Sequence, residues 1–153
     1  MNQLLGEDRI VILAAPGDRG SVIEAAARLL AGDERYAIEP INQSLNARER
    51  LASTAIGHGV AIPHGRIAGI EHSRGAFLRL DQPVDFGAID GSPVDLVFAM
   101  IVPEHFVQQH LQQLAELAER FASREFRQRL RRSASVGKLA ACLMADDLRR
   151  SAA

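Results

Sequence analysis

The chain is poor in cysteine, lysine and large aromatic residues. Among its 153 residues it has one cysteine, one tyrosine and no tryptophan, and Lys138 is its only lysine. A lone thiol forms no internal disulfide, and without a cysteine pair or an HExxH motif a zinc site is not expected. Cys142 lies in the apolar run of residues 139–144, which predicts a buried core thiol.

A large net charge and a long apolar segment are also missing. The 18 basic side chains nearly balance the 19 acidic ones, so no overall attraction to nucleic acid or to a membrane surface is expected. No window approaches the roughly 20 apolar residues of a membrane span, and no signal peptide follows Met1. The arginine-rich run of residues 120–132 is interpreted as a solvated helix face rather than a nucleic-acid patch. We therefore expect a cytoplasmic protein.

The composition, 47% hydrophobic and 24% charged, is typical of a globular protein, and the length fits a single domain, residues 1–153. Apolar runs predict strands at 9–15, 60–62, 74–80 and 94–102. Helical periodicity predicts helices at 21–30, 39–50, 104–122, 124–132 and 135–144, and residues 53–59 are predicted as a glycine-rich loop. This alternation indicates a layered α/β fold.

One histidine follows a short predicted strand, between a proline and a glycine. Pro63 restricts the backbone before His64, and Gly65 lets another molecule approach closely. A strand end is where α/β folds usually place ligands. The spacing alone is compatible with two interpretations of His64: a histidine that binds a phosphoryl group or another ligand, and a turn histidine without a role.

Two further positions have both a structural and a functional interpretation. His110 lies next to the apolar stripe of the long helix formed by Val107, Leu111, Leu114, Ala118 and Phe121. It is either a structural histidine or a hydrogen-bond donor to a group on His64. Arg48 and Arg50 end the second helix, where a cation stabilises the helix terminus or pairs with phosphoryl oxygens.

Three sequence blocks resemble a known family. Residues 53–65 (STAIGHGVAIPHG) resemble the signature of enzyme IIA domains of the bacterial phosphotransferase system, mannitol/fructose class. Residues 84–96 (VDFGAIDGSPVDL), and VPE at 102–104 with HLQQL at 110–114, are similar to its nitrogen-regulatory branch. The resemblance spans about residues 4–145 and implies a mixed β-sheet flanked by α-helices.

The resemblance also implies roles for individual residues. His64 takes the position of the family's phosphorylated histidine, His110 that of its active-site histidine partner, and Arg48 that of an arginine that stabilises the phosphoryl charge. Position 58, often asparagine in the nitrogen branch, is a histidine here. His58 is either a side chain close to the phosphoryl group or, as we favour, a tolerated loop side chain. Ser53 and Thr54 are further candidates for a supporting role around the phosphorylated ring.

The implied function is a phosphocarrier with no metal or organic cofactor. The implied donor is a phosphorylated HPr-like carrier, charged by an enzyme I homologue with phosphoenolpyruvate as the source. The implied regulatory targets are proteins such as transporters or sensor kinases. Two alternatives stay open: a sugar-specific IIA component that passes the phosphoryl group to a IIB domain, and a binding module that is not phosphorylated. A hydrolase or metalloenzyme is disfavoured because the motifs contain no ligand set and no nucleophile–base pair.

Overall fold

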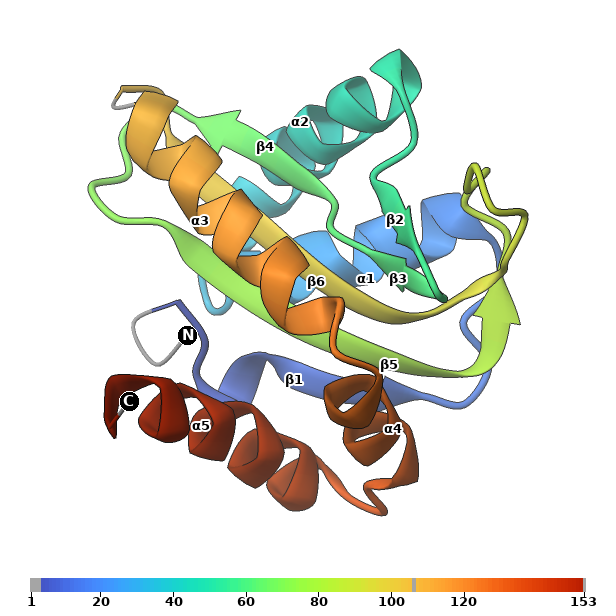
Figure 1. Cartoon of the computed structure of the whole chain (residues 1–153). Helices are drawn as coiled ribbons and strands as arrows, with labels where there is room; N and C mark the ends of the chain where they lie inside the picture. The colour runs from blue at the N-terminus through green and yellow to red at the C-terminus, as the bar shows by residue number, and fades with distance from the viewer. Residues whose placement is uncertain (1–3, 106, 153) are drawn as a thin grey trace.

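A six-stranded mixed β-sheet forms the centre of the molecule (Figure 1). The computed structural model describes residues 4–105 and 107–152, and their side chains except those of residues 36 and 146–152. The strands are β1 (Ile10–Leu13), β2 (Ala55–Gly57), β3 (Val60–Ala61), β4 (His64–Ile67), β5 (Arg74–Val84) and β6 (Val94–Pro103). The helices are α1 (Arg19–Ala31), α2 (Ile38–Leu51), α3 (Val107–Phe121), α4 (Arg124–Arg132) and α5 (Val136–Ala152), with short 3-10 turns at Glu7–Arg9 and Arg35–Ala37. The expected α/β fold with a mixed sheet flanked by helices is thus confirmed.

Strand β6 organises the sheet because it pairs along both of its edges. On one side it is antiparallel to β5, whose other edge pairs in parallel with β1. On the other side β3 and then β4 run parallel to β6, so that Val60 lies opposite Leu96 and His64 lies opposite Met100. Nearly every residue of β6 is buried, as expected for an apolar strand covered on both faces.

Helices cover both faces of the sheet (Figure 1). Alternate side chains of β5 and β6 point to opposite faces. Leu78 and Ala99 pack in the core with α1 and α2, whereas Phe77 and Phe98 pack in the core with α3, α4 and α5. Phe121 of α3 anchors the second core, because its ring centroid lies 6.3 Å from that of Phe77 and 5.4 Å from that of Phe126. Among the described residues, no helix combines the length and the apolar character needed to cross a membrane.

Several local expectations were wrong. Residues 55–57 form strand β2 rather than loop, because a tight turn at His58 and Gly59, with φ angles of 57° and 79°, lets β2 fold back on β3. His64 begins a strand instead of ending one, because Pro63 offers its carbonyl to the Met100 N–H and so keeps the chain beside β6. Cys142 is half-buried at the edge of the second core, not fully buried.

Helix α2 approaches strand β4 closely at Gly65. A Cβ atom on Gly65 would collide with the Ser44 hydroxyl and would lie 3.1 Å from the Ser44 backbone carbonyl carbon. The Ser44 hydroxyl also donates a 2.9 Å hydrogen bond to the carbonyl of Arg66. Absence of a side chain at this position therefore sets how near α2 comes to His64.

We predict that Gly65→Ala destabilises the protein by about 1–3 kcal/mol, because α2 must move away from β4. Urea unfolding followed by circular dichroism measures this change. Gly137→Ala is the control, since a Cβ there would meet only the Ser135 hydroxyl at 3.9 Å. Equal stability of the two variants would contradict the close approach.

Candidate functional site

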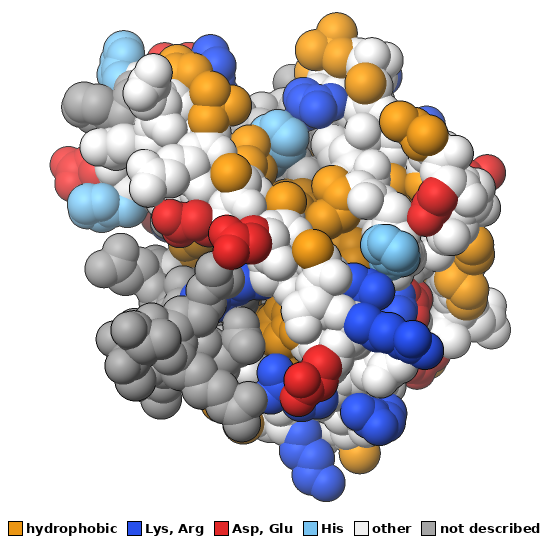
Figure 2. Space-filling view, viewed as in Figure 1, with side chains coloured by type: hydrophobic (Ala, Val, Ile, Leu, Met, Phe, Trp, Pro, Cys, Tyr) orange, Lys and Arg blue, Asp and Glu red, His pale blue; other side chains and the backbone are white. Residues whose placement is uncertain are grey.

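A cavity of about 560 Å³ opens between α2, β4 and α3. Its lining consists of Ser44, Ala47, Arg48, Leu51, His64, Gly65, Arg66, Val102, Val107, His110, Leu111 and Leu114. In Figure 2 the surface is hollowed between α2 and α3, and a histidine lies in the hollow with hydrophobic side chains along its borders. The fold thus brings His64, His110 and Arg48, which are distant in the sequence, into one cavity.

The His64 ring is held by its own backbone neighbourhood. Its Nδ1 lies 2.9 Å from the carbonyl oxygen of Ile62. A carbonyl only accepts hydrogen bonds, so Nδ1 carries the proton in this contact and Nε2 keeps a free lone pair. The arrangement is that of a neutral imidazole with one nitrogen available for attack.

The surroundings keep the His64 ring uncharged. Burial is the main cause that lowers the pKa of His64 below its ordinary value of 6.5, and the Arg48 guanidinium lowers it further. The hydrogen bond to Ile62 and the Glu49 carboxylate act in the opposite direction on this pKa. Because the net pKa is lowered, the nucleophilic neutral form prevails at pH 7.

Arg48 lies in the last turn of α2, where its guanidinium caps the helix end and also lines the cavity. One guanidinium nitrogen donates a 2.7 Å hydrogen bond to the carbonyl of Ala52, just beyond the helix end. The guanidinium has further N–H donors, and it lines the cavity beside His64. Arg50 is exposed and lines neither this cavity nor the neighbouring one.

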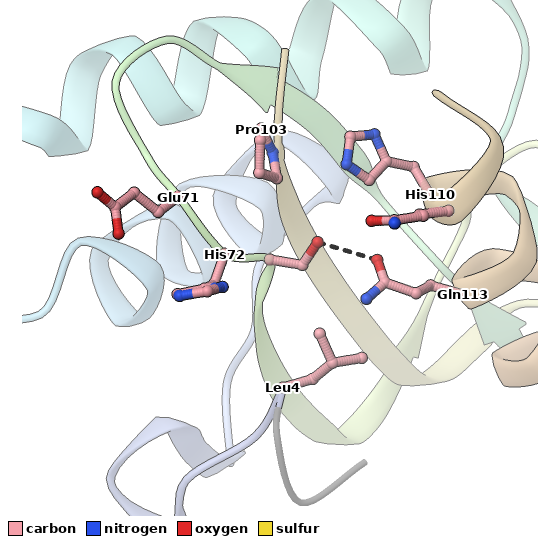
Figure 3. A pocket seen from close by; sticks show the side chains of 8 residues that line it. Leu4, Glu71, His72, Pro103, His110 and Gln113 are labelled. Carbon is pink, nitrogen blue, oxygen red and sulfur yellow. Dashed lines mark hydrogen bonds between the residues drawn. The ribbon is translucent and has the colours of Figure 1, made fainter. Parts of the chain in front are cut away.

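His110 separates the cavity from a second one. Its side chain is only 7% exposed, and within the described part of the chain its Nδ1 is buried without a hydrogen-bond partner. Burial, followed by the charge of Arg66, lowers the pKa of His110. Figure 3 shows His110 beside Pro103 at the second cavity, where the Ser73 hydroxyl donates to the Gln113 side chain at 2.9 Å. A buried ring nitrogen without a partner is unusual and fits a ligand atom that arrives during function.

The supporting candidates lie at different distances from this centre. Ser53 and Thr54 line a smaller adjoining cavity together with His64 and Arg48. His58 lines neither cavity. It sits at the tip of the β2–β3 turn, where its N–H donates to Asp90 at 2.9 Å and its carbonyl accepts from Arg131 at 2.6 Å.

Neither the burial of Glu49 nor the exposure of the first turns of α3 was predicted from the sequence. Glu49 is buried next to Arg48, and the available signal was an acidic residue in the last turn of a helix, where the dipole disfavours it. Leu111 and Val107 were assigned to the core but are 60% and 44% exposed. The stripe is longer than the contact between α3 and the sheet, so its first turns line the cavity instead.

Among the described residues, no group of three or more histidine, cysteine or acidic side chains is arranged to hold a metal ion. The polar side chains that line the cavity are instead a hydroxyl, two imidazoles and the guanidinium groups of Arg48 and Arg66, and guanidinium donors suit an anionic group.

Comparison with known proteins shows the family to which the chain belongs. Residues 3–145 match the family model described as "Phosphoenolpyruvate-dependent sugar phosphotransferase system, EIIA 2". The chain therefore belongs to the EIIA 2 family of the phosphotransferase system. It is 39% identical over 132 residues to a nitrogen regulatory protein of Pseudomonas aeruginosa, covering 86% of each chain. It is 44% identical over 108 residues to a nitrogen regulatory protein of Bradyrhizobium diazoefficiens, covering 71% of this chain and 68% of the relative.

A solved structure shows the same architecture. The crystal structure of the nitrogen regulatory protein IIA-Ntr from Neisseria meningitidis superposes with a TM-score of 0.85 at 38% identity, over 92% of this chain and 96% of that one. The resemblance to the nitrogen-regulatory branch that the second and third sequence blocks indicated is confirmed.

We predict that Arg48→Met raises the pKa of His64, because the variant removes a positive charge that disfavours the imidazolium form. A titration of the His64 ring followed by NMR measures this pKa. Arg50→Met serves as the control, since Arg50 lies outside the cavity. A His64 pKa that is equal in the two variants would contradict the electrostatic role of Arg48.

Proposed function

We propose that this chain is a cytoplasmic phosphocarrier of the nitrogen-related phosphotransferase system that accepts a phosphoryl group on Nε2 of His64. The observation that carries the proposal is the contact between His64 Nδ1 and the Ile62 carbonyl at 2.9 Å, in a ring that lines an open cavity. Because Nδ1 donates in this contact, Nε2 is the nitrogen that we propose as the nucleophile. A turn histidine without a role would have no need of such a constraint or of cationic neighbours.

The proposed reaction is an in-line transfer from a phosphohistidine of the donor. Nε2 of His64 forms a bond to phosphorus while the donor's N–P bond breaks, and the donor nitrogen keeps the electron pair. The ring of His64 then carries a proton on Nδ1 and the phosphoryl group on Nε2, and it is formally cationic. The Ile62 carbonyl stabilises this cation through the Nδ1–H hydrogen bond.

The neighbouring side chains supply charge stabilisation rather than covalent chemistry. Phosphoryl transfer depends mainly on positioning and on neutralising the phosphoryl oxygens. Arg48 offers guanidinium donors from one wall of the cavity, and His110 offers an imidazole from the opposite wall. His110 would then make with a phosphoryl oxygen the hydrogen bond that its buried Nδ1 lacks.

The rim of the site fits a protein partner. Leu51 is 82% exposed and Leu111 is 60% exposed, and with Val107 they border the cavity that contains His64. Ile56, also exposed, borders the adjoining cavity. Exposed apolar side chains gathered around one site mark an interaction surface, and we propose that the phosphorylated HPr-like carrier docks there. An enzyme I homologue would charge that carrier from phosphoenolpyruvate.

The same surface would report the phosphorylation state. A phosphoryl group adds close to two negative charges at pH 7, in a cavity bordered by apolar side chains. Targets such as transporters or sensor kinases that bind the apolar rim would therefore distinguish the two forms. The relatives named nitrogen regulatory protein favour this regulatory output.

We predict that the wild-type protein gains an acid-labile phosphate when it is incubated with phosphoenolpyruvate, enzyme I and the HPr-like carrier, and that His64→Ala gains none. The measurement is mass spectrometry at neutral pH or radiolabelling. His72→Ala is the matched control, because His72 is an exposed histidine outside this cavity. A wild-type protein without label would end the carrier proposal and leave a binding module.

The sugar-specific alternative follows from the family description, which names a sugar phosphotransferase system. The labelled protein separates the two functions when it is mixed with purified IIB domains. Rapid transfer of the label to a IIB domain would favour sugar uptake, whereas retention of the label supports regulation.

We predict that His110→Ala slows phosphoryl acceptance by roughly 10²-fold or more, as expected for a lost transition-state donor, and leaves the affinity for the carrier nearly unchanged. Rapid-quench kinetics with increasing carrier concentration separates these two quantities. His105→Ala, on the exposed segment before α3, is the control. Wild-type kinetics in His110→Ala would remove His110 from the mechanism.

A further inference from the structure

We propose that Glu49 is a positioning residue for phosphoryl transfer, which acts on the His64 ring through the backbone between them. The inference rests on the phosphocarrier function proposed above and assigns a role to a residue outside the two cavities that contain His64.

The Glu49 carboxylate is buried and committed to one neighbour. One of its oxygens accepts a 2.6 Å hydrogen bond from the Thr54 hydroxyl and a 3.2 Å bond from the Thr54 N–H, and the other oxygen accepts from the same N–H at 3.3 Å. Both residues are only 5% exposed. Hydrogen bonds to a charged acceptor are about twice as strong as those between neutral groups. Glu49 therefore anchors the segment that follows α2 to the end of that helix.

The anchored segment continues to the phosphorylatable ring. The carbonyl of Thr54 accepts a 3.0 Å hydrogen bond from the Ile62 N–H. The carbonyl of Ile62 in turn accepts the 2.9 Å bond from Nδ1 of His64. Thr54 and the His64 ring therefore contact the two backbone polar groups of the same residue, so a displacement of Thr54 would shift Ile62 and with it the carbonyl that holds Nδ1.

The backbone that follows Ile62 is held by the sheet. The Pro63 carbonyl accepts a 2.9 Å bond from the Met100 N–H, and His64 pairs with Met100 in the ladder between β4 and β6. The Glu49–Thr54 contact supplies the support from the opposite direction. The two residues before His64 are thus held from both sides, Ile62 by the segment that follows α2 and Pro63 by the sheet.

A charged side chain is energetically unfavourable as an anchor for the Thr54 segment. A buried carboxylate carries a large desolvation penalty unless it is well hydrogen-bonded, and the last turn of a helix repels negative charge. A neutral glutamine would avoid both costs. The charge also acts on the site, because the Glu49 carboxylate raises the pKa of His64 and so opposes the effects of burial and of Arg48. Glu49 thus combines a geometric and an electrostatic action on the same ring.

The decisive variant is Glu49→Gln, with Glu39→Gln as the matched control. Glu39 is an exposed glutamate in the first turn of α2, ten residues and therefore about 15 Å away along the helix. ¹⁵N NMR of the His64 ring reports its tautomer and its pKa in the unphosphorylated protein, without any donor. In Glu49→Gln we expect a smaller fraction of the Nδ1–H tautomer and a lower pKa of His64. Glu39→Gln should match the wild type.

Kinetics adds a second measurement. Because Glu49 is buried and would not contact the donor, Glu49→Gln should reduce kcat for phosphoryl acceptance by about tenfold and leave KM unchanged. A folded Glu49→Gln protein whose His64 tautomer and pKa equal those of Glu39→Gln would overturn the proposal. If the wild type accepts no phosphoryl group at all, the carrier function fails, while the NMR comparison still decides whether Glu49 controls the ring.

Two substitutions of Thr54 keep the test decisive if Glu49→Gln fails to fold. Thr54→Ser retains the hydroxyl donor and should preserve the wild-type tautomer and kcat. Thr54→Val has a similar volume but removes the 2.6 Å hydrogen bond, and it should shift the tautomer in the same direction as Glu49→Gln. Identical His64 spectra for the serine and valine variants would also overturn the proposal.

Discussion

The hydrogen bond between Nδ1 of His64 and the carbonyl of Ile62 connects the fold to the chemistry. The Ile62 carbonyl, one proline before His64 in the chain, holds Nδ1 of the ring and leaves Nε2 free. This geometry needs the chain to leave β3 and enter β4 without leaving β6, since both short strands run parallel to that strand. Pro63 suits the junction because it needs no N–H donor and its carbonyl still pairs with Met100.

The electrostatic surroundings of the ring are a balance rather than a single strong effect. Burial and Arg48 favour the neutral imidazole, whereas the Ile62 carbonyl and Glu49 favour the charged form. A neutral ring is required before transfer, and a cationic phosphorylated ring follows it. An environment that strongly preferred either state would hinder one half of a carrier's cycle, so opposing influences around one imidazole are a physical requirement of the proposed function.

The sequence predicted the layered fold, and it singled out His64 as a candidate, because both features have strong local signals. The apolar run of β6 and the Pro63–Gly65 punctuation around His64 are visible without coordinates. The start of β4 was not predicted because it pairs with β6, which is distant in the sequence. Strand β2 was not predicted because it depends on the tight turn at His58 and Gly59 that folds it back on β3. Glu49 was missed because only the fold shows that Thr54 returns to meet it. Leu111 was misassigned because helical periodicity shows which residues share a face but not where the covering partner ends.

The apolar border of the site implies that the proposed partners compete for one surface. Leu51 and Leu111 are exposed and line the same cavity as His64, so that in the proposed function the carrier and a regulatory target would use the same apolar rim. A regulatory target bound there would shield the imidazole from the incoming carrier. Molecules that hold a target would therefore remain unphosphorylated until the target dissociates. Abundance of one target would thereby delay the response of every other, and the pool of free protein would set how quickly the cell registers a change in phosphoryl supply.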